Sequence, residues 1–298
     1  MRVVMSGSSG LIGTALVASL RSQGHTVVRL VRRSAGAPDE ISWDPAAGTL
    51  DAASLDGVDA VVNLSGAGIG DRRWSDAYKR ELLDSRLHTT DLLARTIAAT
   101  ERPPSVFLSG SAIGWYGPRG DEELTESSTA GSGFLADICE KWEEATGPAE
   151  AAGVRTAHLR TGIVLSPSGG ALKKQLPLFK LGLGGRFGRG TQWQSWISID
   201  DEVAAIEHLL TADVAGPVNL TAPSPVTNRE FTKVLASVLK RPAFVPIPSF
   251  GPKLVLGGEL ADALLFTGQR VLPERLQASG YQFRHPTLEV ALRALLGR

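Results

Sequence analysis

Residues 3–13 read VVMSGSSGLIG, a short apolar run that breaks on glycines into the start of a helix. An amphipathic helix is predicted over residues 14–23 and a second strand over Thr26–Val31, so the segment completes a βαβ unit. Such a turn holds a dinucleotide pyrophosphate, because backbone N–H groups and the positive end of the helix dipole face the phosphates. The residues expected to contact the cofactor here are Gly7, Ser9, Gly10, Leu11, Ile12 and Gly13.

The three glycines have separate expected roles. Gly7 allows the tight turn, Gly10 lets the backbone approach the phosphates, and Gly13 lets the helix pack close to the sheet. Their spacing is G-x-x-G-x-x-G rather than G-x-G-x-x-G, and an ordinary strand-to-helix loop is the alternative interpretation. The strand before and the helix and strand after favour nucleotide binding.

The end of the second strand carries the sequence Arg32-Arg33-Ser34. A protein that prefers NAD usually has a carboxylate there, which binds the ribose 2′-OH. Two guanidiniums and a hydroxyl suit a 2′-phosphate instead, so we expect Arg32 and Arg33 to select NADP(H). A solvated pair of charges on a loop is the alternative.

Composition excludes several classes of function. The 298 residues carry 31 basic and 31 acidic side chains, so no nucleic-acid or membrane partner is indicated. The single cysteine, Cys139, excludes an internal disulfide, and the five histidines show no spacing for metal ligands, so no metal is expected. No signal segment or membrane-spanning run is evident. We expect a cytoplasmic protein, a monomer or homodimer, with a small-molecule substrate.

Strand and helix patterns alternate through the first two thirds of the chain. Strands are predicted over residues 3–5, 26–31, 60–64, 105–109, 155–160 and 217–220, and helices over 14–23, 75–100 and 130–152. A helix follows Asp200 or Asp201 as N-cap, another is capped at Thr227, and a final helix covers 288–296. This alternation predicts an α/β Rossmann fold, a doubly wound parallel sheet with a smaller C-terminal α/β substrate lobe. The predicted domains are 1–168, to which later segments return, and 169–298, which includes the C-terminal region 242–298.

Ligands of such a sheet bind at the carboxyl ends of its strands. The loops at these ends carry small or polar residues, and those expected to contact the cofactor are Asn63, Leu64, Ser65, Gly66, Ser109, Gly162 and Ile163.

The passage from Gly182 to Trp196 is rich in glycine, arginine and tryptophan. It is too apolar for a linker, and we expect a loop that closes over a ligand, with a structural surface loop as the alternative. The candidate substrate residues are Arg186, Arg189, Trp193 and Trp196, of which the two arginines suit an anionic group.

Together these loops resemble the extended short-chain dehydrogenase/reductases, which include the sugar-nucleotide epimerases and dehydratases. More closely, the chain is similar to the atypical YfcH-like "epimerase family protein" group, which has its own C-terminal domain of unknown function. The resemblance rests on short sequence motifs spread along the chain: Asn63–Gly66, Arg73-Trp74, Asp84-Ser85-Arg86, Gly114–Gly117, Phe134-Leu135, Lys141–Glu143, Arg160–Leu165, Gly184–Trp196 and Gln269–Pro273. It implies the fold and a nicotinamide cofactor, but not a particular reaction.

The resemblance also shows what is missing. Family members that transfer hydride use a Tyr and a Lys four residues later, beside a Ser that orients the substrate. No Tyr-x-x-x-Lys occurs in this sequence, and the two positions align with Leu135 and Cys139, while Lys141 faces another side of the helix. A small buried hydrophobic role is expected for Cys139.

Ser111 remains as the candidate donor of a hydrogen bond to substrate, and Tyr116 as a candidate acid. The alternatives are a turn hydroxyl for Ser111 and a packed ring for Tyr116. The predicted function is an NADP(H)-dependent oxidoreductase acting on a small carbonyl or conjugated compound, for which the two arginines Arg186 and Arg189 would suit an anionic group. A non-catalytic NADP(H) sensor is the rival, and a sugar-nucleotide epimerase is third.

Overall fold

The computed structural model describes all 298 residues, Met1–Arg298. Its centre is a sheet of seven strands in the order β11-β7-β5-β4-β1-β2-β3, and every neighbouring pair is parallel. The strand order reverses direction between β1 and β4, which is the topological switch point of a doubly wound fold. The strands are β1 (Arg2–Ser6), β2 (Thr26–Val31), β3 (Glu40–Ser42), β4 (Ala60–Asn63), β5 (Val106–Ala112), β7 (Arg155–Thr161) and β11 (Gly216–Leu220).

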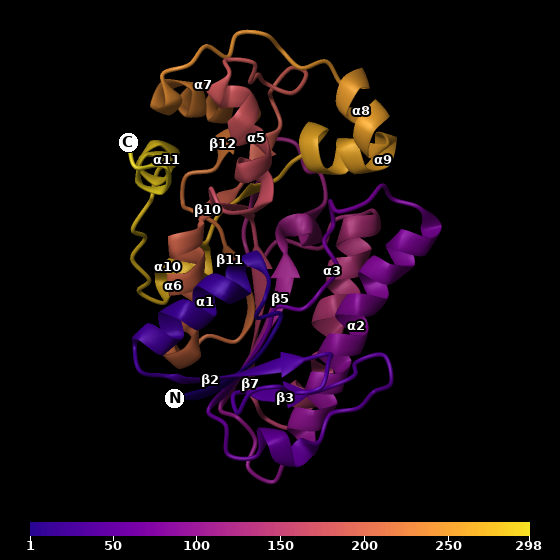
Figure 1. Cartoon of the computed structure of the whole chain (residues 1–298). Helices are drawn as coiled ribbons and strands as arrows, with labels where there is room; N and C mark the ends of the chain where they lie inside the picture. The colour runs from indigo at the N-terminus through magenta and orange to yellow at the C-terminus, as the bar shows by residue number, and fades with distance from the viewer.

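Both faces of the sheet are covered by helices, because successive side chains of each strand point to opposite faces. Val3 and Met5 belong to a core shared with α1 (Leu11–Ser22) and α6 (Ile199–Thr211), whereas Val4 belongs to the core on the other face. That other face is covered by α2 (Asp76–Ala98) and α4 (Gly147–Ala151), and α3 (Phe134–Glu144) packs on α2 and β5. Figure 1 shows α1 and α6 on one side of the sheet and α2 and α3 on the other.

A second lobe lies beyond the carboxyl ends of the strands, above the arrowhead of β5 in Figure 1. Its core is built from α5 (Gly170–Lys180), α7 (Asn228–Leu239) and α11 (Leu288–Leu296). Short strand pairs connect it to the sheet: β8 (Ile163–Leu165) with β10 (Trp196–Ser198), β9 (Trp193–Gln194) with β12 (Val226–Thr227), and β6 (Glu123–Leu124) with β13 (Arg270–Val271). The remaining short elements are the 3₁₀ turns η1 (Ala52–Leu55) and η2 (Ile113–Tyr116), α8 (Phe250–Leu256), α9 (Gly258–Ala261), η3 (Asp262–Phe266) and α10 (Glu274–Ala278).

The predicted strands all lie in the sheet, and the parallel fold class is confirmed. Two local predictions are wrong. The helix predicted over 130–152 is two helices, because the chain turns between Glu144 and Gly147, just before Pro148 enters the first turn of α4. The N-cap of α6 is Ser198, whose hydroxyl accepts from the N–H of Asp201, rather than Asp200 or Asp201.

The capped start predicted at Thr227 is confirmed, and it forms a complete capping box with Glu230. No helix has both the length and the apolar character needed to cross a membrane.

Candidate functional site

The glycine turn after β1 has the geometry that its sequence predicts. Gly7 has φ +68° and lies so close to the loop after β4 that an added Cβ would fall 2.5 Å from the carbonyl carbon of Leu64. At Gly13 a Cβ would meet the carbonyl oxygen of Gly7 at 2.2 Å, so only glycine lets α1 pack this closely. A Cβ at Gly10 would meet only the Gly7 oxygen, at 3.4 Å, and otherwise points into open space.

The start of α1 offers free hydrogen-bond donors. Gly10 is the N-cap and supplies no side-chain cap, and the N–H groups of Leu11 and Ile12 donate to no acceptor in the chain. Gly10 and the neighbouring Ser9 are exposed. Free N–H groups at an exposed helix N-terminus fit a pyrophosphate.

The two arginines after β2 have different surroundings. Arg33 donates two hydrogen bonds to Glu40, of 2.8 and 2.6 Å, and Arg29 also forms an ion pair with Glu40 at 2.9 Å. These contacts, led by the hydrogen bond from Arg33, lower the pKa of the Glu40 carboxyl to about 2. Arg32 is exposed and has no ion pair, so its guanidinium is free to bind a phosphate.

The loop after β4 is fixed by a buried polar network. Asn63 is fully buried, accepts from the Ser6 hydroxyl at 2.6 Å, and donates to Thr90 at 2.8 Å. Its amide oxygen also accepts from the N–H of Ser65. The buried Asn63 side chain therefore fixes the start of the Leu64–Gly66 loop.

A cavity of about 220 Å³ lies at the carboxyl ends of β5 and β7, between the sheet and the second lobe. Ala112, Gly114, Leu135, Ile138 and Trp142 line it on the side of the sheet. Thr161, Gly162 and Ile163, at the end of β7, form its floor, and residues 192–195, 263–265 and 267–269 cover it from the second lobe. Most of this lining is apolar, which suits a small organic molecule or a nicotinamide ring.

Arg86 is the charged group of this cavity, and the sequence prediction missed it. Its side chain, on α2, is 8% exposed, donates to the carbonyl of Leu82 at 2.8 Å, and stacks on the Trp142 ring. It has no carboxylate partner, and burial lowers the pKa of its guanidinium. A Cβ on Gly66 would lie 3.2 Å from the guanidinium carbon. Arg86 therefore lies next to the loop that is predicted to bind the cofactor, as well as in the wall of the cavity.

Leu135 and Cys139 line the cavity from α3, at the positions that would carry the Tyr and the Lys of the family. The Cys139 thiol is 3% exposed and donates to the carbonyl of Ala112 at 3.6 Å, and burial raises its pKa to about 12. The side chain is thus buried, as expected for a small hydrophobic role. Lys141 is exposed and lines no part of the cavity.

Ser111 and Tyr116, the two candidate catalytic residues, are not among the residues that line the cavity, and both hydroxyls are bonded within the protein. The Ser111 hydroxyl donates to Glu143 at 2.6 Å, and Glu143 holds Arg160 through two bonds of 2.8 Å. Arg160 in turn donates to the phenol oxygen of Tyr116 at 3.1 Å.

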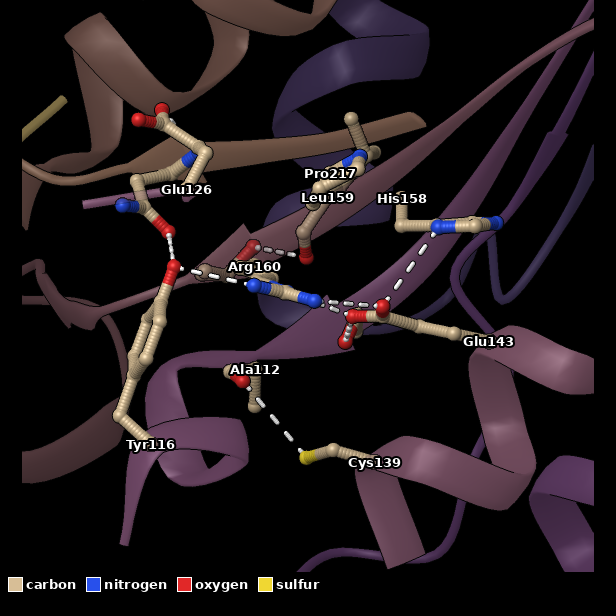
Figure 2. Close-up of polar contacts among 12 residues, drawn as sticks. Ala112, Tyr116, Glu126, Cys139, Glu143, His158, Leu159, Arg160 and Pro217 are labelled. Carbon is tan, nitrogen blue, oxygen red and sulfur yellow. Dashed lines mark hydrogen bonds and ion pairs between the residues drawn. The ribbon is translucent and has the colours of Figure 1, made fainter. Parts of the chain in front are cut away.

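The Tyr116 hydroxyl donates to Asn219 at 2.7 Å, and the ring is completely buried, which raises the pKa of the phenol. Figure 2 shows Arg160 lying between Tyr116 and Glu143, with Cys139 outside this row of polar contacts. Both hydroxyls therefore have structural partners, because Glu143 and Arg160 reach them from α3 and β7. Ser109, also predicted at this end of β5, is buried and its hydroxyl has no partner.

The four residues predicted to bind substrate lie in different parts of the structure. Trp193 lines the cavity, donates to Asp121 at 2.7 Å, and stacks with Arg270. Trp196 does not: it is fully buried in the core of the second lobe, because β10 pairs with β8 and carries the ring inward. Arg189 is exposed, and Arg186 lines a different hollow beside α7. The passage therefore contributes residues 192–195 to the cavity, but neither of its arginines.

The doubly wound sheet and the glycine turn define a dinucleotide-binding protein of the extended short-chain dehydrogenase/reductase class. The chain belongs to the NAD dependent epimerase/dehydratase family, whose model matches residues 3–221, and residues 247–295 match a domain of unknown function, DUF1731.

Relatives match along nearly the whole chain. An epimerase family protein of Mycobacterium tuberculosis is 46% identical over 97% of this chain and 96% of its own length. A crystal structure of human epimerase family protein SDR39U1 (isoform 2) with NADPH is 38% identical, with a TM-score of 0.91 and coverage of 100% of this chain and 99% of that one. A nucleoside-diphosphate sugar epimerase from Corynebacterium glutamicum is also 38% identical, with a TM-score of 0.80, and this chain covers 58% of it.

Proposed function

We propose that the protein is an NADP(H)-dependent oxidoreductase that transfers hydride to a small carbonyl or conjugated compound without a Tyr/Lys pair. The observation that carries this proposal is Arg86, a buried cation without a carboxylate partner in the wall of the cavity. A cation there can stabilise negative charge that develops on a reacting oxygen, as the Lys of the missing pair would otherwise help to do.

Support for the cofactor comes from the glycine turn, the free Arg32 guanidinium and the similarity to the human protein crystallised with NADPH. In this proposal the pyrophosphate contacts residues 9–13, and Arg32 binds the 2′-phosphate. The loops of residues 63–66, Ser109, Gly162 and Ile163 lie along the remainder of the nucleotide. We assign residues 1–168 mainly to cofactor binding and 169–298 mainly to the substrate side, and the cytoplasm remains the expected compartment.

In the proposed reaction, the residues that line the cavity have separate roles. Bound NADPH would supply a hydride for the acceptor carbon. Arg86 would stabilise the negative charge left on the acceptor oxygen, and would equally hold an anionic substituent of the substrate. Leu135, Ile138 and Trp142 would surround this charge with apolar groups, which strengthens the effect of the guanidinium. Since Arg86 and Cys139 are the only titratable groups that line the cavity, the proton for the product comes from water.

The test uses NADPH with a panel of quinones, flavins and aldehydes, and follows the absorbance of the reduced nicotinamide. We expect turnover with at least one class of acceptor, a fall of about a hundredfold in kcat for Arg86→Gln, partial recovery for Arg86→Lys, and unchanged NADPH affinity in both. Arg80→Gln, an exposed arginine of the same helix, is the matched control. Turnover that survives unchanged in Arg86→Gln would remove Arg86 from the mechanism.

A non-catalytic NADP(H) sensor is the second candidate, favoured by the placement of Ser111 and Tyr116 in a buried network away from the cavity. Tight NADPH binding without oxidation by any acceptor of the panel would support it. A sugar-nucleotide epimerase is disfavoured, since Leu135 and Cys139 occupy the positions of the acid–base pair.

A further inference from the structure

A second hollow lies in the C-terminal lobe, away from the cavity described above. Its volume is about 260 Å³, and it shares no lining residue with that cavity. Arg186, Arg229, Lys233 and Arg241 bring four cationic side chains to it, and Thr232 adds a hydroxyl. On α7, Thr232 and Lys233 follow Arg229 by three and four residues, about one turn, so the helix presents all three on one face.

The charges of this hollow are not compensated by the protein. No carboxylate lines it, and none of the four cations forms an ion pair. Glu230, beside Arg229 in sequence, is held by the capping box through its bonds to Thr227. Because the whole chain has a net charge of zero, four uncompensated cations around one hollow are a local feature.

Arg186 adds an observation of a different kind. Its Nε atom is buried and has no hydrogen-bond partner, so no acceptor of the protein compensates this guanidinium through Nε. Arg229 is anchored, because one of its terminal nitrogens donates to the carbonyl of Arg189 at 3.1 Å. The hollow is therefore lined by one guanidinium without an ion-pair partner and by a second whose position is fixed.

The loop that carries Arg186 separates the two sites. Phe187, the next residue, makes an edge-to-face contact with Phe266 at 6.1 Å, and its carbonyl accepts from Gln192, which lines the cavity. Arg186 itself lines the hollow beside α7 and no part of the cavity. The hollow is thus a site separate from the cavity.

We propose that this hollow binds a small anion with several negative charges, such as a diphosphate group. A guanidinium can donate two parallel hydrogen bonds to a phosphate group. A single carboxylate would neutralise only one of the four positive charges, whereas a diphosphate carries several negative charges. The volume also accommodates more than one phosphate group. This site does not depend on the proposed oxidoreductase function.

Calorimetric titration with inorganic pyrophosphate tests the site directly. The glycine turn could also bind pyrophosphate, so the titration is made on the full-length protein and on Gly10→Val, whose added side chain fills the phosphate side of that turn. We expect a pyrophosphate site that persists in Gly10→Val and weakens about tenfold or more in Arg229→Gln/Lys233→Gln. Higher salt should weaken binding as well, and orthophosphate should bind less tightly.

The control is Arg80→Gln/Lys173→Gln, which removes the same charge from two exposed residues without ion pairs and should leave pyrophosphate affinity unchanged. Circular dichroism verifies that each variant is folded. The proposal is overturned by an absence of heat at millimolar pyrophosphate, by unchanged affinity in Arg229→Gln/Lys233→Gln, or by loss of all binding in Gly10→Val. Orthophosphate binding as tight as that of pyrophosphate would overturn the multivalent character of the site.

Discussion

Arg32 and Arg33 are adjacent in sequence, yet only one of them is available to a ligand. Arg33 is held by Glu40 at the start of β3, whereas Arg32 has no partner. The sequence predicts a phosphate site from the pair as a whole, since nothing in the pattern indicates that Glu40 will pair beside β2. That contact depends on the register between β2 and β3, which places Arg29 opposite Glu40.

This difference predicts unequal effects of two substitutions. Arg32→Ala should remove most of the preference for NADPH over NADH, about tenfold or more, because it deletes the free guanidinium. Arg33→Ala should change that preference much less and should instead lower stability, since Glu40 loses its bidentate partner. Calorimetric titration of both nucleotides into both variants gives the comparison; a larger loss of preference in Arg33→Ala would reverse the assignment.

Ser111 is the second residue whose role follows from its partner. Its hydroxyl donates to Glu143, which remains bound to Arg160, so Ser111→Ala removes one hydrogen bond and leaves the ion pair intact. We expect a loss of about 1 kcal/mol in the free energy of unfolding, with unchanged NADPH affinity. Urea denaturation measures the loss. A folded variant of native stability that fails to oxidise NADPH would mean that Ser111 acts on the substrate.

At the scale of elements, the packing of α3 against α2 brings Arg86 close to Cys139, one of the two positions of the missing Tyr/Lys pair. Arg86 of α2 and Cys139 of α3 both line the cavity, and the charge of Arg86 acts on the thiol. A lysine at position 139 would therefore place a second buried cation beside the first. Alignment could identify Leu135 and Cys139 from sequence, but Arg86 lies about fifty positions earlier in the chain, and only the fold brings it to the same cavity.

Cys139→Lys should accordingly destabilise the protein by about 3 kcal/mol or more, the usual consequence of an unpaired buried charge. Adding Arg86→Gln should recover part of this loss, because it removes the like charge. A double-mutant cycle of the two substitutions, measured by urea denaturation, reports the coupling between them. Strictly additive effects would show that the two side chains do not interact.

Helix α6 carries a buried carboxyl that makes stability depend on pH. Glu202 is fully buried, one oxygen accepts from Thr161 at 2.9 Å, and the other has no partner. Burial raises its pKa to about 8, from 4.5 in an exposed chain. The folded protein thus keeps this proton where the unfolded chain has already lost it.

The contribution of Glu202 to stability is therefore fully present below pH 4.5 and is lost as the pH rises toward 8, at up to about 1.4 kcal/mol per pH unit. Glu202→Gln, which carries no titrating proton, should flatten the decline across this interval and be the more stable protein at its upper end. Thermal unfolding of both proteins across this range is the measurement. Parallel profiles for the two proteins would exclude Glu202 as the source of the pH dependence.

For the whole molecule, the order of apolar and glycine-rich segments is enough to predict the parallel sheet and the glycine turn. These features depend on local periodicity and on short turns. The sequence predicts part of the cover of the cavity, from the Gly182–Trp196 passage, but not the part formed by residues 263–265 and 267–269, which lie far from the strands in sequence. Trp196 illustrates the same limit. The sequence of a glycine-rich passage does not distinguish a tryptophan that packs into a core from one that faces a ligand.

The central claim is that the switch point of the sheet binds NADP(H) in preference to NAD(H). The most direct measurement is calorimetric titration of the unmodified protein with NADPH and with NADH at the same ionic strength. The account predicts one site that binds NADPH about tenfold or more tightly, through the contact of Arg32 with the 2′-phosphate. Equal affinities for the two nucleotides, or no binding of either, would contradict it.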